Sequence, residues 1–280
     1  FLKPIDLAAE HLPPHLLASF PRSIEFIGQV AIIEFPPELE PYKEILGSSI
    51  LKAHKNVKTV LAKAGAVKGA YRIRKFEIIA GSENTETVHK EFGCIFRLDP
   101  RRVYFSPRLS YEHFRVTSKV NEGENVIDMF AGVGPFSIMI AKKVKRVKVY
   151  AIDINPEAIR YLTMNIVLNG VEGKVISMLG DAREIISKRL RGIADRVIMN
   201  LPEKASVYLP VACNALKDKG GIIHCYQFAR GENAILKAEK IAERIIKNST
   251  YRKHCRILSS RIVREVAPFT WQVAVDLEVK

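Results

Sequence analysis

The 280-residue sequence has few cysteines and lacks the spacings in which cysteine and histidine commonly bind a metal. Its four cysteines are scattered and form no C-x-x-C pair, and its seven histidines show no H-E-x-x-H pattern. We therefore expect neither a disulfide framework nor a metal site, and we expect an intracellular protein.

Long apolar runs are also missing. No stretch approaches the roughly 18 uninterrupted apolar residues that a membrane span requires. The opening residues show no charged segment followed by an apolar one, so we expect a cytoplasmic rather than a secreted protein. Phe1 is not an initiator methionine, which leaves open whether residues precede it. Hydrophobic residues make up 48% of the chain and exclude wholesale disorder.

Acidic residues are scarce relative to basic ones. There are 30 Asp and Glu against 44 Lys and Arg, a net charge of +14. Two stretches, 51–75 and 244–264, contain eight and seven basic residues and no acidic residue. Such one-signed stretches favour a polyanionic partner such as nucleic acid, although solvated surface charge is the simpler alternative.

The length favours one large domain and a smaller one. In the first part we expect a strand over Ile24–Phe35, a helix from Pro41 to Lys63, and short strands between Tyr71 and Phe105. A helix followed by a run of strands predicts an α+β domain, which we place at residues 1–108.

From residue 109 to the end, apolar strands alternate with helices. This rhythm predicts a mostly parallel sheet covered on both faces, closed by an antiparallel hairpin. The predicted strands are Asn125–Phe130, Val147–Ile152, Val175–Leu179, Asp195–Met199, Gly221–Gln227, Cys255–Glu265 and Thr270–Glu278. The predicted helices are Phe136–Lys143, Pro156–Leu168, Ala182–Leu190, Val207–Leu216 and Glu232–Lys247.

The densest chemical signal is VIDMFAGVGPFS, in which a strand ends at Asp128 and a glycine-rich turn leads into a helix. Gly132 and Gly134 allow the backbone to approach a ligand, and the helix start offers free N–H groups. Ser137 stands where the dinucleotide fingerprint has its third glycine, so the turn alone is weak evidence.

Three further strands also end in polar residues. Asp153 follows the second strand, where an acid can hold the hydroxyls of a ribose, and Asp181 follows the third, within reach of an adenine amino group. The fourth strand ends in Asn200-Leu201-Pro202. Each could be a helix cap, but four polar tips in succession predict a cofactor site at the carboxyl edge of the sheet.

These strings resemble a known family. DMFAGVGPFS, DINPEA, GDAR and NLP, with VYFSPRLSYEHFRV upstream, are similar to the class I S-adenosylmethionine-dependent methyltransferases. More narrowly, they resemble the archaeal and eukaryotic tRNA (guanine-37, N1) methyltransferases and their wyosine-pathway relatives. The resemblance implies a Rossmann-like class I fold, S-adenosyl-L-methionine as cofactor, tRNA as partner, and tRNA binding by the basic domain 1–108. We expect a monomer.

The resemblance also implies residue roles. Guanine N1 carries a proton, so the enzyme must remove it with a positioned carboxylate; Glu122 corresponds to that carboxylate, with Glu124 as the alternative. Phe114 or Tyr208 would hold the extruded base. The residues implied to face the base are Asn200 and Pro202, those implied to contact base or phosphate are Arg108 and Arg115, and those implied to bind cofactor are His113, Asp128, Phe130, Gly132, Gly134, Asp153, Ile154, Asp181, Ala182 and Asn200.

Other readings remain open. A relative transfers the aminocarboxypropyl group of the same cofactor, and a bifunctional one also methylates a tricyclic wyosine precursor. A methyltransferase acting on an exocyclic amine usually carries (N/D)PP(Y/F) where this chain has Asn200-Leu201-Pro202-Glu203, which argues against it. A non-catalytic tRNA-binding protein is disfavoured by the intact acids at the strand tips.

Overall fold

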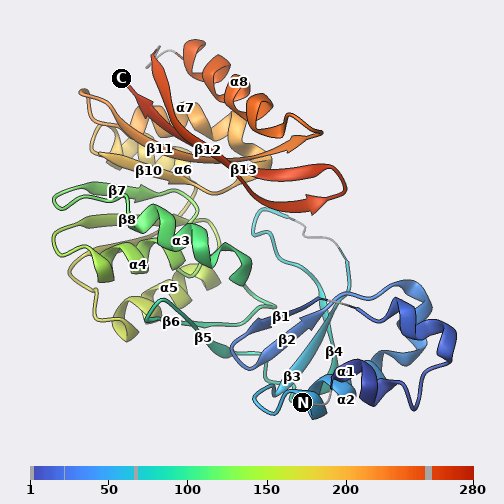
Figure 1. Ribbon diagram of the computed structural model, residues 1–280. Helices are drawn as coiled ribbons and strands as arrows, with labels where there is room; N and C mark the ends of the chain where they lie inside the picture. The colour runs from blue at the N-terminus through green and yellow to red at the C-terminus, as the bar shows by residue number, and fades with distance from the viewer. Residues whose placement is uncertain (1–2, 22, 66–68, 250–253) are drawn as a thin grey trace. The chain divides into compact units, whose positions relative to one another are not determined.

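The computed structural model describes residues 3–21, 23–65, 69–249 and 254–280 (Figure 1). The chain folds as two compact units, Phe1–Pro107 and Arg108–Lys280. Within the described residues, no helix has both the length and the apolar character that crossing a membrane requires.

The larger unit is built on a seven-stranded sheet of order β12-β13-β11-β10-β7-β8-β9. The five strands from β11 to β9 run parallel, whereas β13 pairs antiparallel with both β11 and β12. The predicted mostly parallel sheet with an antiparallel closing hairpin is therefore confirmed. The strands are β7 (Asn125–Asp128), β8 (Lys148–Asp153), β9 (Val175–Leu179), β10 (Arg196–Met199), β11 (Gly221–Arg230), β12 (Cys255–Ala267) and β13 (Thr270–Val279).

Helices cover both faces of this sheet (Figure 1). Helices α4 and α5 pack on β8 and β9, with α3 against α4, while α7 and α8 pack on β10, β11 and the hairpin. A large buried apolar cluster lies under α7 and α8. The helices are α3 (Ser110–Thr117), α4 (Pro135–Lys143), α5 (Pro156–Leu168), α6 (Ala182–Ile185), which continues as a short π-helical segment Ile186–Leu190, α7 (Ala205–Ala215) and α8 (Ala234–Lys247).

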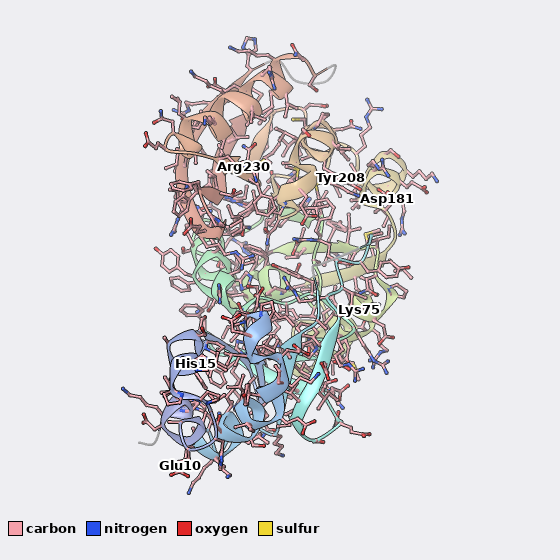
Figure 2. All side chains as sticks on the ribbon, turned by 90° about the vertical axis from the view of Figure 1, so that its right-hand side faces the viewer. Glu10, His15, Lys75, Asp181, Tyr208 and Arg230 are labelled. Carbon is pink, nitrogen blue, oxygen red and sulfur yellow. The ribbon has the colours of Figure 1, made fainter. Side chains whose placement is uncertain are left out.

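Local sequence explains how three of these helices begin. Gly134 precedes α4 with φ of +93°, and a Cβ there would lie 2.4 Å from Leu162 Cδ1, so this turn requires glycine. Asn155 caps α5 by accepting from the Glu157 N–H, and Asp181 caps α6 by accepting from the Arg183 N–H. Figure 2 labels Asp181 beside Tyr208 of α7.

The smaller unit holds a four-stranded sheet of order β1-β2-β3-β4, with α2 packed on β3 and β4. Apolar side chains of the sheet and α2 form its core. A separate hairpin, β5-β6, is tied to the turn after β1 because the Gln29 N–H donates to Thr87 Oγ1 at 2.8 Å. The elements are α1 (Pro4–Ala8), a 3-10 turn (Pro14–Ser19), β1 (Ile24–Ile27), β2 (Val30–Ile33), a second 3-10 turn (Pro37–Tyr42), α2 (Lys43–Ala53), β3 (Thr59–Lys63), β4 (Phe76–Gly81), β5 (Thr87–Glu91) and β6 (Cys94–Leu98).

Two predictions for this unit were wrong. Ile24–Phe35 is not one strand but the hairpin β1-β2, turning at Gly28 with φ of +55°. The predicted helix from Pro41 to Lys63 contains α2 and then the buried strand β3, because an apolar run such as that of β3 fits a strand as well as a helix.

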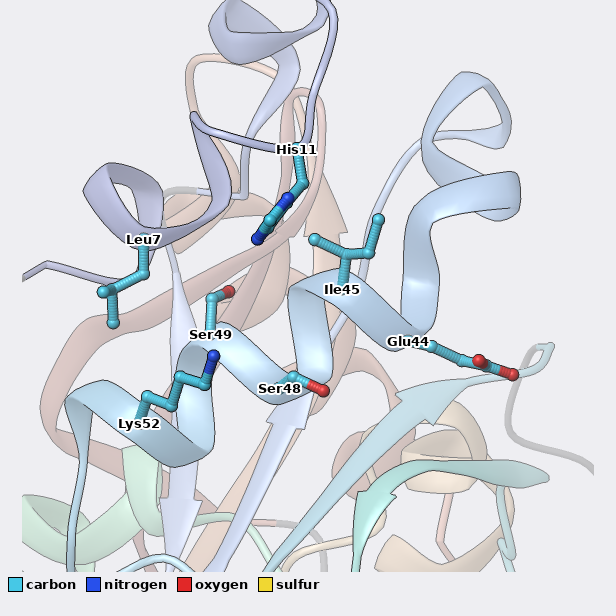
Figure 3. Close-up of a pocket in the computed structure, with 7 residues that line it drawn as sticks. All are labelled: Leu7, His11, Glu44, Ile45, Ser48, Ser49 and Lys52. Carbon is cyan, nitrogen blue, oxygen red and sulfur yellow. The ribbon is translucent and has the colours of Figure 1, made fainter.

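A small hollow of about 290 Å³ lies beside α1 and α2 in this unit. In Figure 3, Leu7 and His11 face the α2 residues across it. Its lining mixes apolar, acidic and basic side chains: Leu7, His11, Glu44, Ile45, Ser48, Ser49 and Lys52.

Candidate active site

The glycine-rich turn after β7 is held to the neighbouring strand by a carboxylate. Asp153, the last residue of β8, accepts from the Gly132 N–H at 2.8 Å through Oδ2 and from the Asn155 N–H at 2.8 Å through Oδ1. Burial raises the pKa of Asp153, and these N–H donors oppose that shift. Each oxygen keeps a lone pair, so Asp153 can still accept from the hydroxyls of a ribose.

Asp128 lies fully buried at the tip of β7. Its Oδ2 accepts from the Ser137 hydroxyl at 2.8 Å, while Oδ1 accepts no hydrogen bond from the described part of the chain. Burial raises the pKa of Asp128 to about 7, the Ser137 hydroxyl opposes the shift, and the nearby charge of Asp153 adds to it. A buried acceptor without a partner fits a ligand donor such as the ammonium group of a methionine moiety.

The residues that follow β8 and β9 contribute apolar and acidic side chains to the same edge. Ile154 directly follows β8 and is 40% exposed, which suits contact with an adenine ring. Ala182 is buried in the first turn of α6. Both carboxylate oxygens of Asp181 pair with the Arg183 guanidinium, which lowers the pKa of Asp181, so adenine would share this carboxylate with Arg183.

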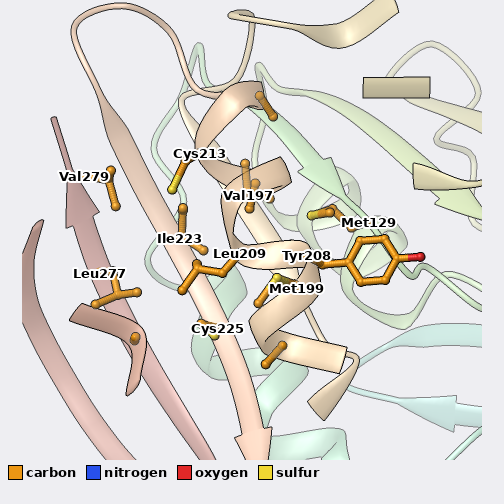
Figure 4. Close-up of a cluster of buried hydrophobic side chains, with 14 of the residues drawn as sticks. Met129, Val197, Met199, Tyr208, Leu209, Cys213, Ile223, Cys225, Leu277 and Val279 are labelled. Carbon is orange, nitrogen blue, oxygen red and sulfur yellow. The ribbon is translucent and has the colours of Figure 1, made fainter. Parts of the chain in front are cut away.

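An aromatic pair lies beside this edge. Phe130, in the turn after β7, contacts the ring of Tyr208 edge to face at 4.9 Å between centroids. The Arg183 guanidinium lies 5.5 Å from the Tyr208 ring centroid. In Figure 4 the Tyr208 ring stands at the margin of the apolar cluster with its hydroxyl directed away from Leu209. Tyr208 is therefore placed to contact a ligand at the carboxyl edge.

The fourth tip carries Asn200 and Pro202. Asn200 follows β10 and accepts from the Gln272 side-chain amide, Nε2 to Oδ1, at 3.2 Å. Pro202 is buried and begins a short 3-10 turn before α7. The structure thus brings Asp128, Asp153, Asp181 and Asn200 to one edge of one sheet, as the parallel order of their strands requires.

Two neighbours on α3 have different surroundings. His113 is buried, and its ring meets Phe136, in the first turn of α4, at 4.6 Å between centroids. Phe114 is partly exposed, and Lys143 Nζ lies 5.4 Å from its ring centroid. Lys143 is the last residue of α4. The stacking role of Phe114 stays a prediction.

The predicted base also requires correction. Glu122 precedes β7, at the amino edge of the sheet, whereas Asp128 ends that strand at the carboxyl edge. The Glu122 side chain is 47% exposed and forms an ion pair with Arg146 at 3.0 Å. Glu124 forms an ion pair with the buried Arg196 at 2.7 Å; its burial would raise the pKa, but Arg196 lowers it. Neither carboxylate faces the cofactor edge.

Glu112 is a buried carboxylate that was not predicted from the sequence, and its hydrogen-bond partner Tyr226 belongs to a strand that reaches the carboxyl edge. Glu112 on α3 is 2% exposed, and its Oε2 accepts from the Tyr226 hydroxyl at 2.8 Å and from Arg115 Nε at 2.9 Å. Tyr226 follows Cys225, which pairs with Met199, so Tyr226 stands level with Asn200. Glu112 Oε1 accepts no hydrogen bond from the described residues, although Arg261 Nη1 lies 3.1 Å away. The string YEHFR contained this residue, but only its last three positions were assigned.

Arg115 is not available for substrate. Its guanidinium spans Glu112 and Asp276, with Nη1 to Oδ2 at 2.5 Å, and its side chain is largely buried. The predicted contact with base or phosphate is therefore wrong, because every edge of the fork serves an internal acid. Arg108 is exposed at the start of this unit, and its substrate role stays a prediction.

Asp276 is the centre of a buried polar network. Besides Arg115 it accepts from Lys119 Nζ at 2.6 Å, Ser259 Oγ at 2.9 Å and His224 Nδ1 at 2.6 Å. Arg196 Nη1 lies 2.9 Å from His224 Nε2 and can only donate, so His224 carries its proton on Nδ1. Burial lowers the pKa of His224 and favours this neutral form.

Several basic residues of the stretches 51–75 and 244–264 interact with side chains of their own unit. Arg261 contacts Glu112, Arg264 donates to Gln272, and Arg256 pairs with Glu278. Lys63 pairs with Glu34. Lys68, Arg252 and Lys253 lie outside the described residues. Binding of tRNA by residues 1–108 stays a prediction.

We expect Asp153→Ala to weaken S-adenosylmethionine binding by about 10- to 100-fold, because two hydrogen bonds to a charged group would be lost and the glycine-rich turn released. Isothermal titration calorimetry measures this, with the exposed Glu172→Gln as a control expected to bind normally. Unchanged affinity in Asp153→Ala would remove Asp153 from the cofactor site.

The chain is similar to known tRNA-modifying methyltransferases. A family model described as the TRM5/TYW2 methyltransferase domain matches residues 87–258, and one described as the TYW2 N-terminal domain matches residues 6–85. The tRNA (guanine(37)-N(1))-methyltransferase Trm5b of Pyrococcus abyssi is 44% identical over 96% of this chain and 78% of its own length. The tRNA 4-demethylwyosine(37)-methyltransferase Taw21 of Saccharolobus solfataricus is 37% identical over 92% and 94%.

Solved structures agree. The complex of aTrm5 with tRNALeu superposes with a TM-score of 0.85 at 34% identity, covering 100% of this chain and 80% of that one. Methanocaldococcus jannaschii TYW2 in complex with AdoMet superposes with a TM-score of 0.66 at 30% identity, covering 92% and 99%.

The fold and the acidic strand tips define a class I S-adenosylmethionine-dependent methyltransferase. Within that class, the chain belongs to the TRM5/TYW2 methyltransferase family. The predicted enzyme class and cofactor are thereby confirmed, and the residues at the carboxyl edge fit the cofactor: an unpartnered buried Asp128 oxygen, the two acceptors of Asp153 and the exposed Ile154.

Proposed function

We propose that this protein transfers the methyl group of S-adenosylmethionine to N1 of guanosine 37 in the tRNA anticodon loop. The observation that carries the proposal is that two neighbouring strands, β10 and β11, each position one polar group at the same level of the sheet: a donor-capable amide and a buried carboxylate. These are Asn200, after β10, and Glu112, held by Tyr226 of the adjacent strand β11.

When bound, S-adenosylmethionine supplies an electrophilic methyl group. The chain's own task is then to align guanine N1 and remove its proton. Tyr226 and Arg115 both donate to Glu112 Oε2. The oxygen that takes the proton is therefore Oε1, which accepts no hydrogen bond from the described residues and has Arg261 Nη1 3.1 Å away. As N1 loses its proton, negative charge develops on guanine O6, where a donor stabilises it; the Asn200 amide can supply one.

Tyr208 supports the step before chemistry. A base in the anticodon loop must leave its stack before it reaches the site, and an aromatic ring stabilises it once extruded. Tyr208 stands against Phe130 at the carboxyl edge.

Methyl transfer to three tRNA transcripts tests the proposal. With labelled S-adenosylmethionine we expect incorporation into a transcript with guanosine 37, none when position 37 is adenosine, and unchanged incorporation when another loop guanosine is replaced. Equal labelling of the adenosine 37 transcript would refute the assignment of position 37.

A second candidate is methylation of a tricyclic wyosine precursor at the same position. Similarity to Taw21 over 94% of that protein's length favours it. Methyl transfer is measured both to tRNA that carries 4-demethylwyosine and to the guanosine 37 transcript. Labelling of one substrate or of both shows whether the enzyme methylates guanosine, the wyosine precursor, or both.

That the enzyme works as a monomer in the cytoplasm also stays a prediction. Light scattering on the eluting protein tests the monomer; a mass near twice the 31.5 kDa of the chain would contradict it.

A further inference from the structure

Asn200 is held by side chains of the closing hairpin. Gln272 of β13 is 2% exposed, and its Nε2 donates to Asn200 Oδ1 at 3.2 Å. Gln272 Oε1 accepts from Arg264 Nε of β12 at 2.9 Å. Arg264 and Gln272 are direct partners in the β12–β13 ladder, so the strand register itself places one side chain beside the other.

The direction of this chain of hydrogen bonds is fixed at its Arg264 end. A guanidinium only donates, so the Gln272 atom that faces it must be the oxygen. The other end of the Gln272 amide, which faces Asn200, is then the NH₂ group. Asn200 therefore accepts this hydrogen bond with its side-chain oxygen. Asn200 Nδ2 is left, and it makes no hydrogen bond with the described residues.

We propose that Arg264 and Gln272 are positioning residues that determine which end of the Asn200 amide faces the substrate. The inference rests on the proposed function and deepens it. A fixed NH₂ group selects a base with an acceptor next to the reacting nitrogen, such as O6 beside N1 of guanine. An exocyclic amine would instead require an oxygen to accept its N–H.

Two substitutions of similar volume test the inference. In Gln272→Glu one carboxylate oxygen pairs with Arg264 and the other faces Asn200, whose amide must turn over and present Oδ1 to the substrate. Gln272→Met fills the same space, forms neither hydrogen bond and leaves the Asn200 amide free to adopt either orientation. In single-turnover methyl transfer we expect a loss of about 100-fold for Gln272→Glu, the size of losing one transition-state donor, and only a few-fold loss for Gln272→Met.

Stability separates positioning from a merely structural role. Gln272→Glu keeps a partner for Arg264, so it should melt no lower than Gln272→Met. A structural role would make activity follow melting temperature, whereas positioning reverses the order: the more stable variant is slower. The dissociation constant for S-adenosylmethionine should stay unchanged in both variants.

An Asn200→Ala background completes the experiment. Because Gln272 acts through Asn200, adding Gln272→Glu there should cause no further loss. The inference is overturned if Gln272→Glu retains the wild-type rate, or if its full loss persists without Asn200. Failure of the proposed function is seen separately, since the wild-type enzyme would then leave guanosine 37 unmethylated.

Discussion

Replacing Glu112 by glutamine is expected to lower the rate of methyl transfer by about 10²- to 10⁴-fold, the range typical of a general base. Tyr226 and Arg115 would still donate to the remaining oxygen, which places the new NH₂ group where Oε1 stood. That group cannot accept the N1 proton. Single-turnover kinetics measures the rate, and calorimetry should show unchanged cofactor affinity.

Glu122→Gln is the matched control. Glu122 is half-exposed, paired with Arg146, and lies at the amino edge of β7, so we expect nearly full turnover. A slow Glu122→Gln together with an active Glu112→Gln would restore the base suggested by sequence resemblance and contradict the geometry.

Replacing Asp276 by alanine is expected to cost about 3–5 kcal/mol of stability, as when one partner of a buried ion pair is removed. Arg115, Lys119 and His224 would each lose an acceptor. Urea unfolding measures the loss. Glu184→Ala, which breaks the exposed pair with Lys188, should cost less than about 1 kcal/mol. Similar losses in both variants would show that the network contributes little.

The same network predicts a pH dependence. Burial alone would raise the pKa of Asp276, but the hydrogen bonds and charges of His224, Arg115 and Lys119 lower it far below its usual value. Because the folded pKa lies below the unfolded value of about 3.9, the stabilisation is complete above that pH and is lost as the pH falls further. The stability difference between the wild type and Asp276→Ala should therefore narrow below about pH 4.

The parallel sheet could be predicted because its elements have strong local signals. Helix α5 and strand β9 have the predicted bounds, since Asn155-Pro156 starts one and a short apolar run forms the other. The smaller unit was harder. There β3 follows α2 after only five residues, and the short apolar run of β3 fits a strand as well as a helix, so periodicity alone could not separate them.

The polar strand tips could also be predicted, because parallel strands bring their carboxyl ends to one edge. The residues that complete the site could not. Glu112 becomes a candidate only when Tyr226, 114 positions away, donates to it, and Gln272 only when it meets Asn200 across 72 positions. Conversely, Glu122 is close to Asp128 in sequence, but it precedes strand β7 whereas Asp128 ends it, so the two residues lie at opposite edges of the sheet.

The most direct test identifies the atom that is methylated. tRNA with guanosine 37 is incubated with the enzyme and S-adenosylmethionine carrying a trideuterated methyl group, then digested and analysed by chromatography and mass spectrometry against the isomeric methylguanosines. We expect the label to elute as 1-methylguanosine derived from position 37. Label in N2-methylguanosine or 7-methylguanosine would contradict this expectation.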